Sequence, residues 1–201
     1  MKILMTVLLA LVFTGALTAQ TLTKTERKEA VKYIKWCTKE LKKSLKGLSE
    51  AQLSFKPAAD RWSPQDCMYH IAFSEGTLRG ALDQALNAPA DPKAKAELKA
   101  TDEEIKAGVV SRTNKVKTAE PFQPENTGYK SLAEAIAAFD GKRAMLIELV
   151  KTTNADLCNH IVALPFGKMD AYQFILFIAG HSNRHTQQIN EVKTVEGYPG
   201  S

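Results

Sequence analysis

Hydrophobic residues recur at spacings of three and four along residues 23–48, with lysines between them. This spacing places the apolar side chains on one face of an α-helix and the charged ones on the other. The apolar positions are Ala30, Ile34, Cys37, Leu41, Leu45 and Leu48. We therefore predict a long amphipathic helix over residues 23–48.

A second helix begins in the sequence WSPQD. Ser63 is a favoured N-cap residue, and Pro64 suits the first helical position, where no backbone N–H is needed. Asp66 follows three residues after the cap, where its charge favours the positive end of the helix dipole. The pattern continues to about Leu86.

Residues 87–130 interrupt the pattern with prolines near both ends. We expect an irregular excursion there, with one short helix near residues 101–117. Ser131 and Glu134 then have the spacing of a capping box, which predicts a third helix that runs to about Val150.

The last long helix is expected over about residues 169–194, after a loop or short extended stretch at residues 156–170. Strand signals are almost absent. Four long helices with one long connection, between the second and the third, predict an all-α four-helix bundle. No internal repeat divides the chain, so we expect residues 21–201 to form one domain.

Two histidines lie four residues apart in the apolar stretch FILFIAGHSNRHTQQI of the last helix. At about 100° per residue, His181 and His185 fall in the middle of the apolar face, whereas Asn183 and Gln187 fall opposite. Side chains at positions i and i+4 stand one above the other, with Cβ atoms about 6 Å apart. Both imidazoles can therefore reach one ion inside the bundle.

His70 lies on the apolar face of the second helix, whereas Glu75 and Arg79 are expected to point away from the core. Helix bundles build metal sites from side chains on facing helices. Three imidazoles leave coordination positions free for water or substrate, and they suit zinc, nickel, iron or copper. We therefore predict a divalent-metal site made by His70, His181 and His185.

Three further side chains are candidates for substrate binding. Arg143, on the inward side of the third helix, either binds an anionic substrate or a carboxylate, or packs its stem on the bundle with its head in water. Ser74 and Thr77 follow His70 and either line a pocket or bond back to their helix. We expect no inward carboxylate that could act as a general base, and we do not expect His160 to be a ligand.

The first 20 residues contain Lys2, an apolar run from Ile3 to about Leu17, and then small or polar residues. This is the layout of a secretory signal peptide that is cleaved near residues 18–20. The run is short for a membrane span of about 20 residues, and an uncleaved anchor is the alternative. We expect residues 1–20 to be a signal peptide and the mature protein to be soluble, without a stable membrane span, and either periplasmic or secreted.

Charge and cysteine content narrow the choice of partners. The net charge of +5 is spread along the chain without a dense basic patch, which argues against a nucleic-acid partner. Cys37, Cys67 and Cys158 lack metal-binding spacing. We expect buried, unreactive thiols, with a single disulfide as the open alternative.

The stretches WSPQDCMYHIAFSE and FGKMDAYQFILFIAGHSNRHTQQINEV resemble the DinB-like superfamily of four-helix bundles. The family's pattern is a Trp-Ser helix start, a histidine further along that helix, and a C-terminal helix with two histidines four residues apart. The resemblance covers about residues 25–195 and implies that His70, His181 and His185 are metal ligands. Members include thiol-dependent S-transferases, isomerases and proteins described as metal-dependent hydrolases. They often form dimers, so a homodimer is a further expectation.

Three functions remain open. The first is an exported, divalent-metal-dependent hydrolase of a small molecule, in which the ion lowers the pKa of a water molecule or polarises a substrate carbonyl or thiol. The second is a non-catalytic bundle that binds a metal or a small molecule. The third is a thiol S-transferase, which the export signal disfavours because low-molecular-weight thiol cofactors occur mainly in the cytoplasm.

Overall fold

The computed structural model describes residues 21–113 and 117–200. Its four long helices are α1 (Lys24–Leu45), α3 (Pro64–Asn87), α6 (Leu132–Thr152) and α7 (Ala171–Val192). The shorter elements are α2 (Glu50–Ser54), α4 (Pro92–Glu97), α5 (Asp102–Val110), the 3-10 helices η1 (Glu120–Phe122) and η2 (Pro124–Asn126), and the strands β1 (Ile161–Leu164) and β2 (Gly167–Asp170). The expected signal peptide, residues 1–20, lies outside the described residues.

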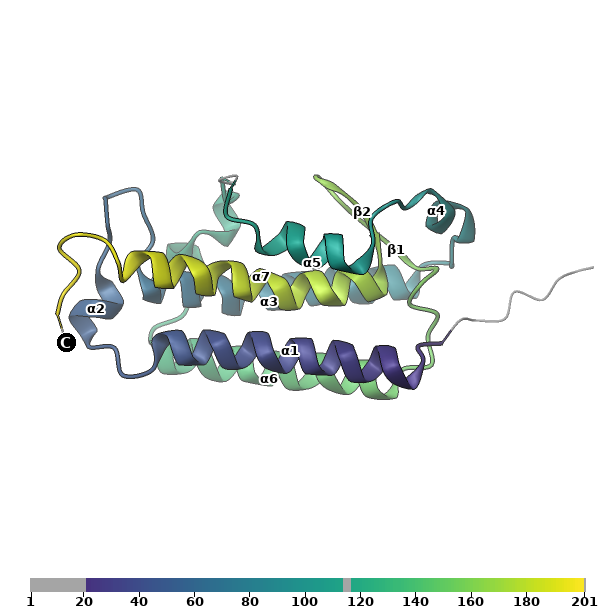
Figure 1. Cartoon of the computed structure of the whole chain (residues 1–201), viewed down its shortest axis with the longest axis horizontal. Coiled ribbons are helices and arrows are strands. Elements are labelled where there is room, and N and C mark those ends of the chain that lie inside the picture. The colour runs from purple at the N-terminus through teal and green to yellow at the C-terminus, as the bar shows by residue number, and fades with distance from the viewer. Residues whose placement is uncertain (1–20, 114–116, 201) are drawn as a thin grey trace, which may run out of the picture.

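The four long helices form the bundle that the hydrophobic pattern predicts (Figure 1). Helix α1 packs against α6 and α7, and α3 packs against the same two helices, so α1 and α3 lie diagonally opposite each other. Helices α1 and α7 run in one direction, whereas α3 and α6 run in the other (Figure 1). The long connection after α3 returns the chain to the end of the bundle where α3 begins, which allows α6 to run parallel to α3.

Each long helix begins at a residue that can cap it. Thr23, Ser63 and Asp170 each accept a hydrogen bond from the backbone three residues on and complete a capping box. Ser131 accepts the corresponding bond at the start of α6. The predicted starts of the first three long helices are therefore confirmed, whereas the last helix begins at Ala171 because Asp170 is its cap.

Two strands occupy part of the expected loop before α7. Strands β1 and β2 pair in an antiparallel hairpin, with Val162 opposite Met169 and Leu164 opposite Gly167. Val162 and Met169 are buried, so this pair anchors the hairpin in the core. The short extended stretch that we allowed for here is thus a hairpin, whose strands have only four residues each and show too little alternation for their pairing to be recognised from the sequence.

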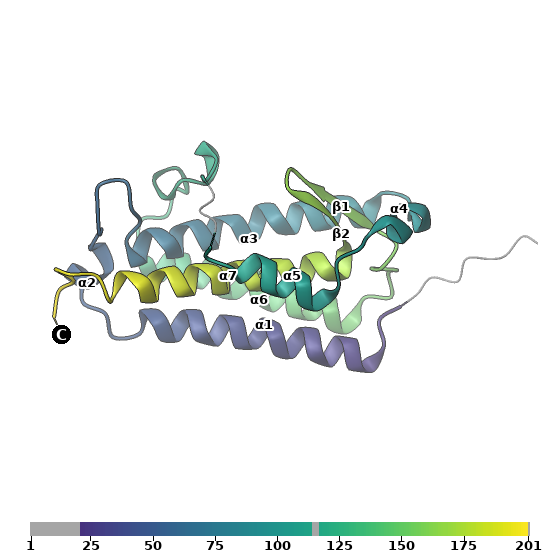
Figure 2. The ribbon, with the colours of Figure 1, turned by 45° about the horizontal axis from the view of Figure 1, so that its top comes forward.

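Helix α5 covers the side of α7 that we expected to lie opposite the core (Figure 2). Asn183 is buried, and Gln187 donates a hydrogen bond to the backbone carbonyl of Val110 at the end of α5. Gly180 permits this close approach, since a Cβ atom there would lie 2.3 Å from Cγ1 of Val109. The short helix expected near residues 101–117 is therefore present as α5, and its packing against α7 is the feature that the sequence did not predict.

The core fills the space between the long helices. Its largest fully buried apolar side chains are Ile34, Leu41, Met68, Ile71, Leu82, Phe139, Leu157, Phe174, Ile175, Ile178 and Ile189. These positions include most of the apolar face predicted for the last helix. No helix of the described residues combines the length and hydrophobicity that crossing a bilayer requires.

The three cysteines are free thiols, so the alternative of a disulfide is not realised. Cys37 and Cys67 are buried, and Cys158 is partly buried. Burial raises the pKa of all three thiols, to about 11 for Cys37 and Cys158. A raised pKa keeps a thiol protonated near neutral pH, which agrees with the expected unreactive cysteines.

Candidate metal centre

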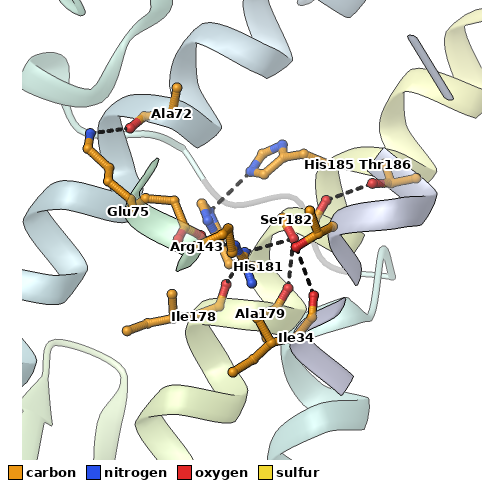
Figure 3. A network of polar contacts seen from close by, with 12 residues as sticks. Ile34, Ala72, Glu75, Arg143, Ile178, Ala179, His181, Ser182, His185 and Thr186 are labelled. Atoms are coloured by element: carbon orange, nitrogen blue, oxygen red, sulfur yellow. Dashed lines mark hydrogen bonds and ion pairs between the residues drawn. The ribbon is translucent and has the colours of Figure 1, made fainter. Parts of the chain in front are cut away.

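The imidazole rings of His70, His181 and His185 meet between helices α3 and α7. The Nε2 atom of His181 lies 3.3 Å from Nε2 of His70 and 3.2 Å from Nε2 of His185. Taking one ring nitrogen from each residue, all three lie within 4.8 Å of one another. The structure thus brings together the three histidines that the sequence pattern selects, two of which are visible in Figure 3.

Hydrogen bonds at the far side of two rings determine which nitrogen carries the proton. Nδ1 of His70 lies 2.8 Å from the backbone carbonyl oxygen of Phe122, and Nδ1 of His185 lies 3.0 Å from Oε1 of Gln188. Carbonyl oxygens only accept hydrogen bonds, so both Nδ1 atoms donate and both Nε2 atoms keep a lone pair. Arg112 also donates to Oε1 of Gln188, at 3.4 Å, which supports the same orientation of this amide.

The Nε2 atom of His181 lies within hydrogen-bonding distance of Nε2 of both other histidines. Its Nδ1 atom is buried and has no hydrogen-bond partner among the described residues. Burial lowers the pKa of all three imidazoles, and neighbouring histidines and arginines lower the pKa of His181 and His185 further. The rings are therefore neutral near neutral pH, which is the form in which imidazole binds metal ions.

The three Nε2 atoms are better arranged to bind a divalent cation than to form hydrogen bonds with one another. The Nε2 lone pairs of His70 and His185 both point to Nε2 of His181, and one proton there cannot bond well to both. A cation in their midst would be bound by all three lone pairs. Three imidazole ligands would also leave coordination positions open for water or substrate.

Aromatic rings pack around the cluster. The centroid of the Trp62 ring lies 4.8 Å from that of His70 and 5.7 Å from that of His185. The ring of Phe177 lies nearly parallel to that of His181, with centroids 6.4 Å apart. His70 and His185 are only 5% and 6% exposed, whereas His181 is partly exposed, so the cluster is most open to solvent at His181.

A buried ion pair connects three of the helices beside the cluster (Figure 3). Nη2 of Arg143 on α6 donates to the carboxylate of Glu75 on α3 at 2.5 Å and to the hydroxyl of Ser182 on α7 at 2.9 Å. It also donates to the backbone carbonyl of Ile178 at 3.1 Å. Because Ser182 follows His181 directly, these bonds hold α3 and α7 together at the level of the histidines.

The position of Glu75 corrects the sequence analysis. We expected Glu75 to point away from the core and no carboxylate to face inward, and both expectations were wrong, since Glu75 is 2% exposed. Helix α3 packs against both α6 and α7, so its buried arc is wider than one apolar face. Arg143 does face inward, but its head is bonded to Glu75 inside the bundle and does not extend to water.

The remaining candidates lie at different distances from the cluster. The hydroxyl of Ser74 lies 3.4 Å from Nε2 of His70, so this residue adjoins the site. Thr77 is exposed, about two turns beyond His70 along α3. His160 forms a hydrogen bond with the backbone carbonyl of Ala85 at 3.0 Å and is not part of the cluster.

Sequence reasoning missed two groups that support the histidine rings. The carbonyl of Phe122 leaves no trace in a residue pattern, because every residue has one. Arg112 lies after α5 and forms an ion pair with Glu191 of α7 at 2.8 Å, which holds it beside Gln188. Only the position of Gln188, three residues after His185 on the same helix, is a signal that the sequence carries.

The fold and the cluster define the class of protein: a four-helix bundle with three imidazoles gathered between two facing helices. A family model described as the DinB superfamily matches residues 33–189, and the chain belongs to this superfamily. The "Uncharacterized protein YuaE" of Bacillus subtilis (strain 168) is 25% identical over 150 residues, which are 74% of this chain and 88% of YuaE.

A solved structure has a similar fold. YfiT from Bacillus subtilis, described as "a probable metal-dependent hydrolase with an unusual four-helix bundle topology", matches with a TM-score of 0.59 and 14% sequence identity. The match covers 90% of this chain and 93% of YfiT. At this identity the comparison establishes the shared fold.

Proposed function

We propose that the protein is a divalent-metal-dependent hydrolase of a small molecule, with the ion held by Nε2 of His70, His181 and His185. The observation that carries this proposal is the convergence of three neutral imidazoles on one point. Membership of the DinB superfamily supports it, as does the fold shared with YfiT, a probable metal-dependent hydrolase. Zinc, nickel, iron and copper are the ions that this ligand set suits.

An ion bound here would supply Lewis acidity, which polarises the bond to be cleaved and lowers the pKa of water. The chain itself holds and orients the ligands. The carbonyl of Phe122 and the amide of Gln188 fix the rings of His70 and His185. Trp62 packs against both of these rings and keeps water from that side of the site.

Elemental analysis of the purified protein tests the proposal. We expect about one divalent ion per chain in the wild type and little in a His181→Ala, His185→Ala double variant, since one imidazole alone binds weakly. His160→Ala is the matched control, because His160 lies outside the cluster, and its metal content should equal that of the wild type.

Equal metal content in the wild type and the double variant would refute the proposed site. If the metal content does depend on the two histidines, hydrolysis is tested by assaying the metal-loaded protein against a panel of amides and esters. Product formation should require both the ion and the histidines. An ion present at full occupancy with no hydrolysis of any member would favour a different role.

A second candidate function is a non-catalytic bundle that binds an ion, and the burial of His70 and His185 favours it. In a closed site the ion exchanges slowly and accepts no added ligand. Loss of the ion to a chelator within minutes, together with binding of a small anion such as azide to the Co²⁺-loaded protein, would favour the hydrolase instead.

We also propose that the chain is exported, because the first 20 residues have the layout of a signal peptide. The mass of the protein recovered from separated cell fractions tests this proposal. Intact residues 1–20 on protein in the cytoplasmic fraction would contradict it. Sedimentation of the same sample tests the homodimer that the family resemblance implies.

A further inference from the structure

A row of aromatic rings leads from the histidine cluster to the protein surface. Phe177 precedes His181 by one turn of α7, and the two rings lie nearly parallel with centroids 6.4 Å apart. Phe177 also stacks on Phe166, in the turn of the β1–β2 hairpin, with centroids 5.6 Å apart and planes 28° apart. Both separations are within the range of offset-stacked aromatic pairs. Phe177 is therefore in contact with both a ligand residue and a surface ring.

Phe166 is unusually exposed for a phenylalanine. Its side chain is 68% accessible to solvent, the highest value among the exposed large hydrophobic residues of the described part of the chain. Turns of this kind are usually occupied by Gly, Asn, Asp or Ser. Pro165 at the first central position and Gly167 after the turn already satisfy its geometry. Phe166 thus has no local structural reason to be a large apolar residue.

The hairpin holds this ring in a defined place. Val162 and Met169 are paired across the two strands and buried in the core. At the base of the hairpin, Asp170 caps α7 and forms an ion pair with Lys95. The turn lies on the side of the bundle away from α1 and α6 (Figures 1 and 2). An apolar ring held in this way can bind a ligand at a small entropic cost.

We propose that Phe166 and Phe177 bind an apolar group of the substrate, aryl or alkyl, while its reactive bond lies at the three histidines. The inference rests on the proposed function, since it takes the ion as the anchor for the reactive end. The two rings carry neither charge nor hydrogen-bonding atoms, so the matching part of the substrate is uncharged and apolar. The substrate class is therefore an amide or ester with a bulky hydrophobic substituent close to the bond that is hydrolysed.

Two hydroxamates test this proposal on the Co²⁺-loaded protein. Acetohydroxamate and benzohydroxamate share a metal-binding head, and only the second carries an aromatic tail. Calorimetry gives their affinities, and the visible spectrum of Co²⁺ reports whether the head is bound to the ion. For the wild type we expect benzohydroxamate to bind about tenfold more tightly, as expected when much of one aromatic ring is buried.

Phe166→Ala should remove about threefold to tenfold of the benzohydroxamate affinity and leave that of acetohydroxamate unchanged, because only the tail meets the ring. Phe166→Leu should keep part of the advantage. Trp36→Ala is the matched control, since Trp36 is an exposed aromatic residue on α1, and both affinities should stay as in the wild type. Phe166 is exposed, so its variants should fold with unchanged melting temperature.

Three results would overturn this inference and leave the proposed function standing. Equal affinity of the two hydroxamates for the wild type would mean that no apolar site adjoins the ion. An equal loss of both affinities in Phe166→Ala would show a general effect on the ion site. Conversion of a dimer to a monomer by Phe166→Ala would show that a second copy of the chain covers the ring. Failure of the protein to take up Co²⁺ at all would instead refute the proposed function, and with it this inference.

Discussion

Arg143 and Glu75 form an ion pair that is almost completely shielded from water, and burial and pairing have opposing effects on the pKa of Glu75. Burial raises the pKa of Glu75, whereas the neighbouring guanidinium of Arg143 lowers it. The Nε and Nη1 atoms of Arg143 have no hydrogen-bond partner among the described residues, although the guanidinium lies 4.9 Å from the centroid of the Phe139 ring. Each member of the pair therefore depends strongly on the other.

We expect Arg143→Met to lower the free energy of unfolding by about 3–5 kcal/mol, because it leaves the Glu75 carboxylate buried without its partner. The double variant Arg143→Met, Glu75→Leu should lose less than the single one, since both buried charges are then gone. Urea denaturation of the metal-free proteins measures both values. A double variant less stable than Arg143→Met would contradict this account of the pair.

Gln188 acts on the cluster through His185, whose Nδ1 proton it accepts. We expect Gln188→Leu to weaken metal binding by about 10- to 100-fold, as is typical for the loss of an outer partner of a ligand histidine. Competition with a chromophoric chelator measures the affinity. Gln84→Leu, at an exposed position of α3, is the matched control and should bind metal like the wild type. An unchanged affinity in Gln188→Leu would mean that this hydrogen bond does not orient the ligand.

At the scale of elements, the docking of α5 on α7 decides which side of α7 meets solvent. A helix with polar residues on one face normally turns that face to water. Here α5 covers it, and Gly180 gives the room for contact, because a Cβ atom there would lie 2.3 Å from Cγ1 of Val109 on α5 and 2.9 Å from the hydroxyl of Tyr33 on α1. Gly180 immediately precedes His181, so this contact also supports the turn of α7 that carries this histidine.

Replacing Gly180 by alanine has two opposing effects on the free energy of unfolding. Alanine favours a helix over glycine by about 1 kcal/mol, but its Cβ would lie 2.3 Å from Cγ1 of Val109. Overpacking of this kind costs about 1–3 kcal/mol, so we expect net destabilisation in urea denaturation.

Gly141 of α6 is the matched control, because nothing lies within 4 Å of a Cβ there, and Gly141→Ala should raise stability by about 1 kcal/mol. Adding Val109→Ala to Gly180→Ala should restore part of the loss. Stabilisation by Gly180→Ala alone would show that α5 does not pack as closely as described.

At the scale of the whole molecule, the cluster needs nearly every part of the fold. Helix α3 supplies one imidazole and α7 supplies two. The connection between α3 and α6 contributes the carbonyl of Phe122 and the side chain of Arg112, and α6 contributes Arg143. Forming the site therefore requires the folded bundle, so the protonation of its histidines is linked to global stability.

This linkage has a definite sign. The pKa values of His70, His181 and His185 lie below the ordinary imidazole value of about 6.5 in the folded protein. Below that pH the unfolded chain binds protons that the folded one does not. The free energy of unfolding of the metal-free protein should therefore fall as the pH falls from about 6.5 toward the lower pKa values of the folded state.

Urea denaturation from about pH 7 down to about pH 5 measures this dependence. The His181→Ala, His185→Ala double variant should show a shallower dependence, because it lacks two of the three groups. Identical slopes would contradict the linkage. Saturating divalent metal should add stability in the wild type alone, by about 4 kcal/mol at a concentration of a thousand times Kd.

The helices and the three histidines could be predicted because their signals are local and periodic. Caps such as Ser63 and Ser131 and the spacing of His181 and His185 depend only on nearby positions along one helix. The hairpin, the docking of α5 and the inward turn of Glu75 could not be predicted, because each depends on which helix lies alongside.

The amino-acid sequence by itself determined where the long helices begin, which faces are apolar and which imidazoles lie on those faces, since 3.6-residue periodicity and capping act within a few turns of chain. Only the tertiary structure decided that α3 and α7 are antiparallel neighbours and that the backbone carbonyl of Phe122 orients the ring of His70. It also decided that Arg143 binds Glu75 and that Phe166 stands beside Phe177. These pairings join residues far apart in the chain, and their energies depend on burial that no single element creates.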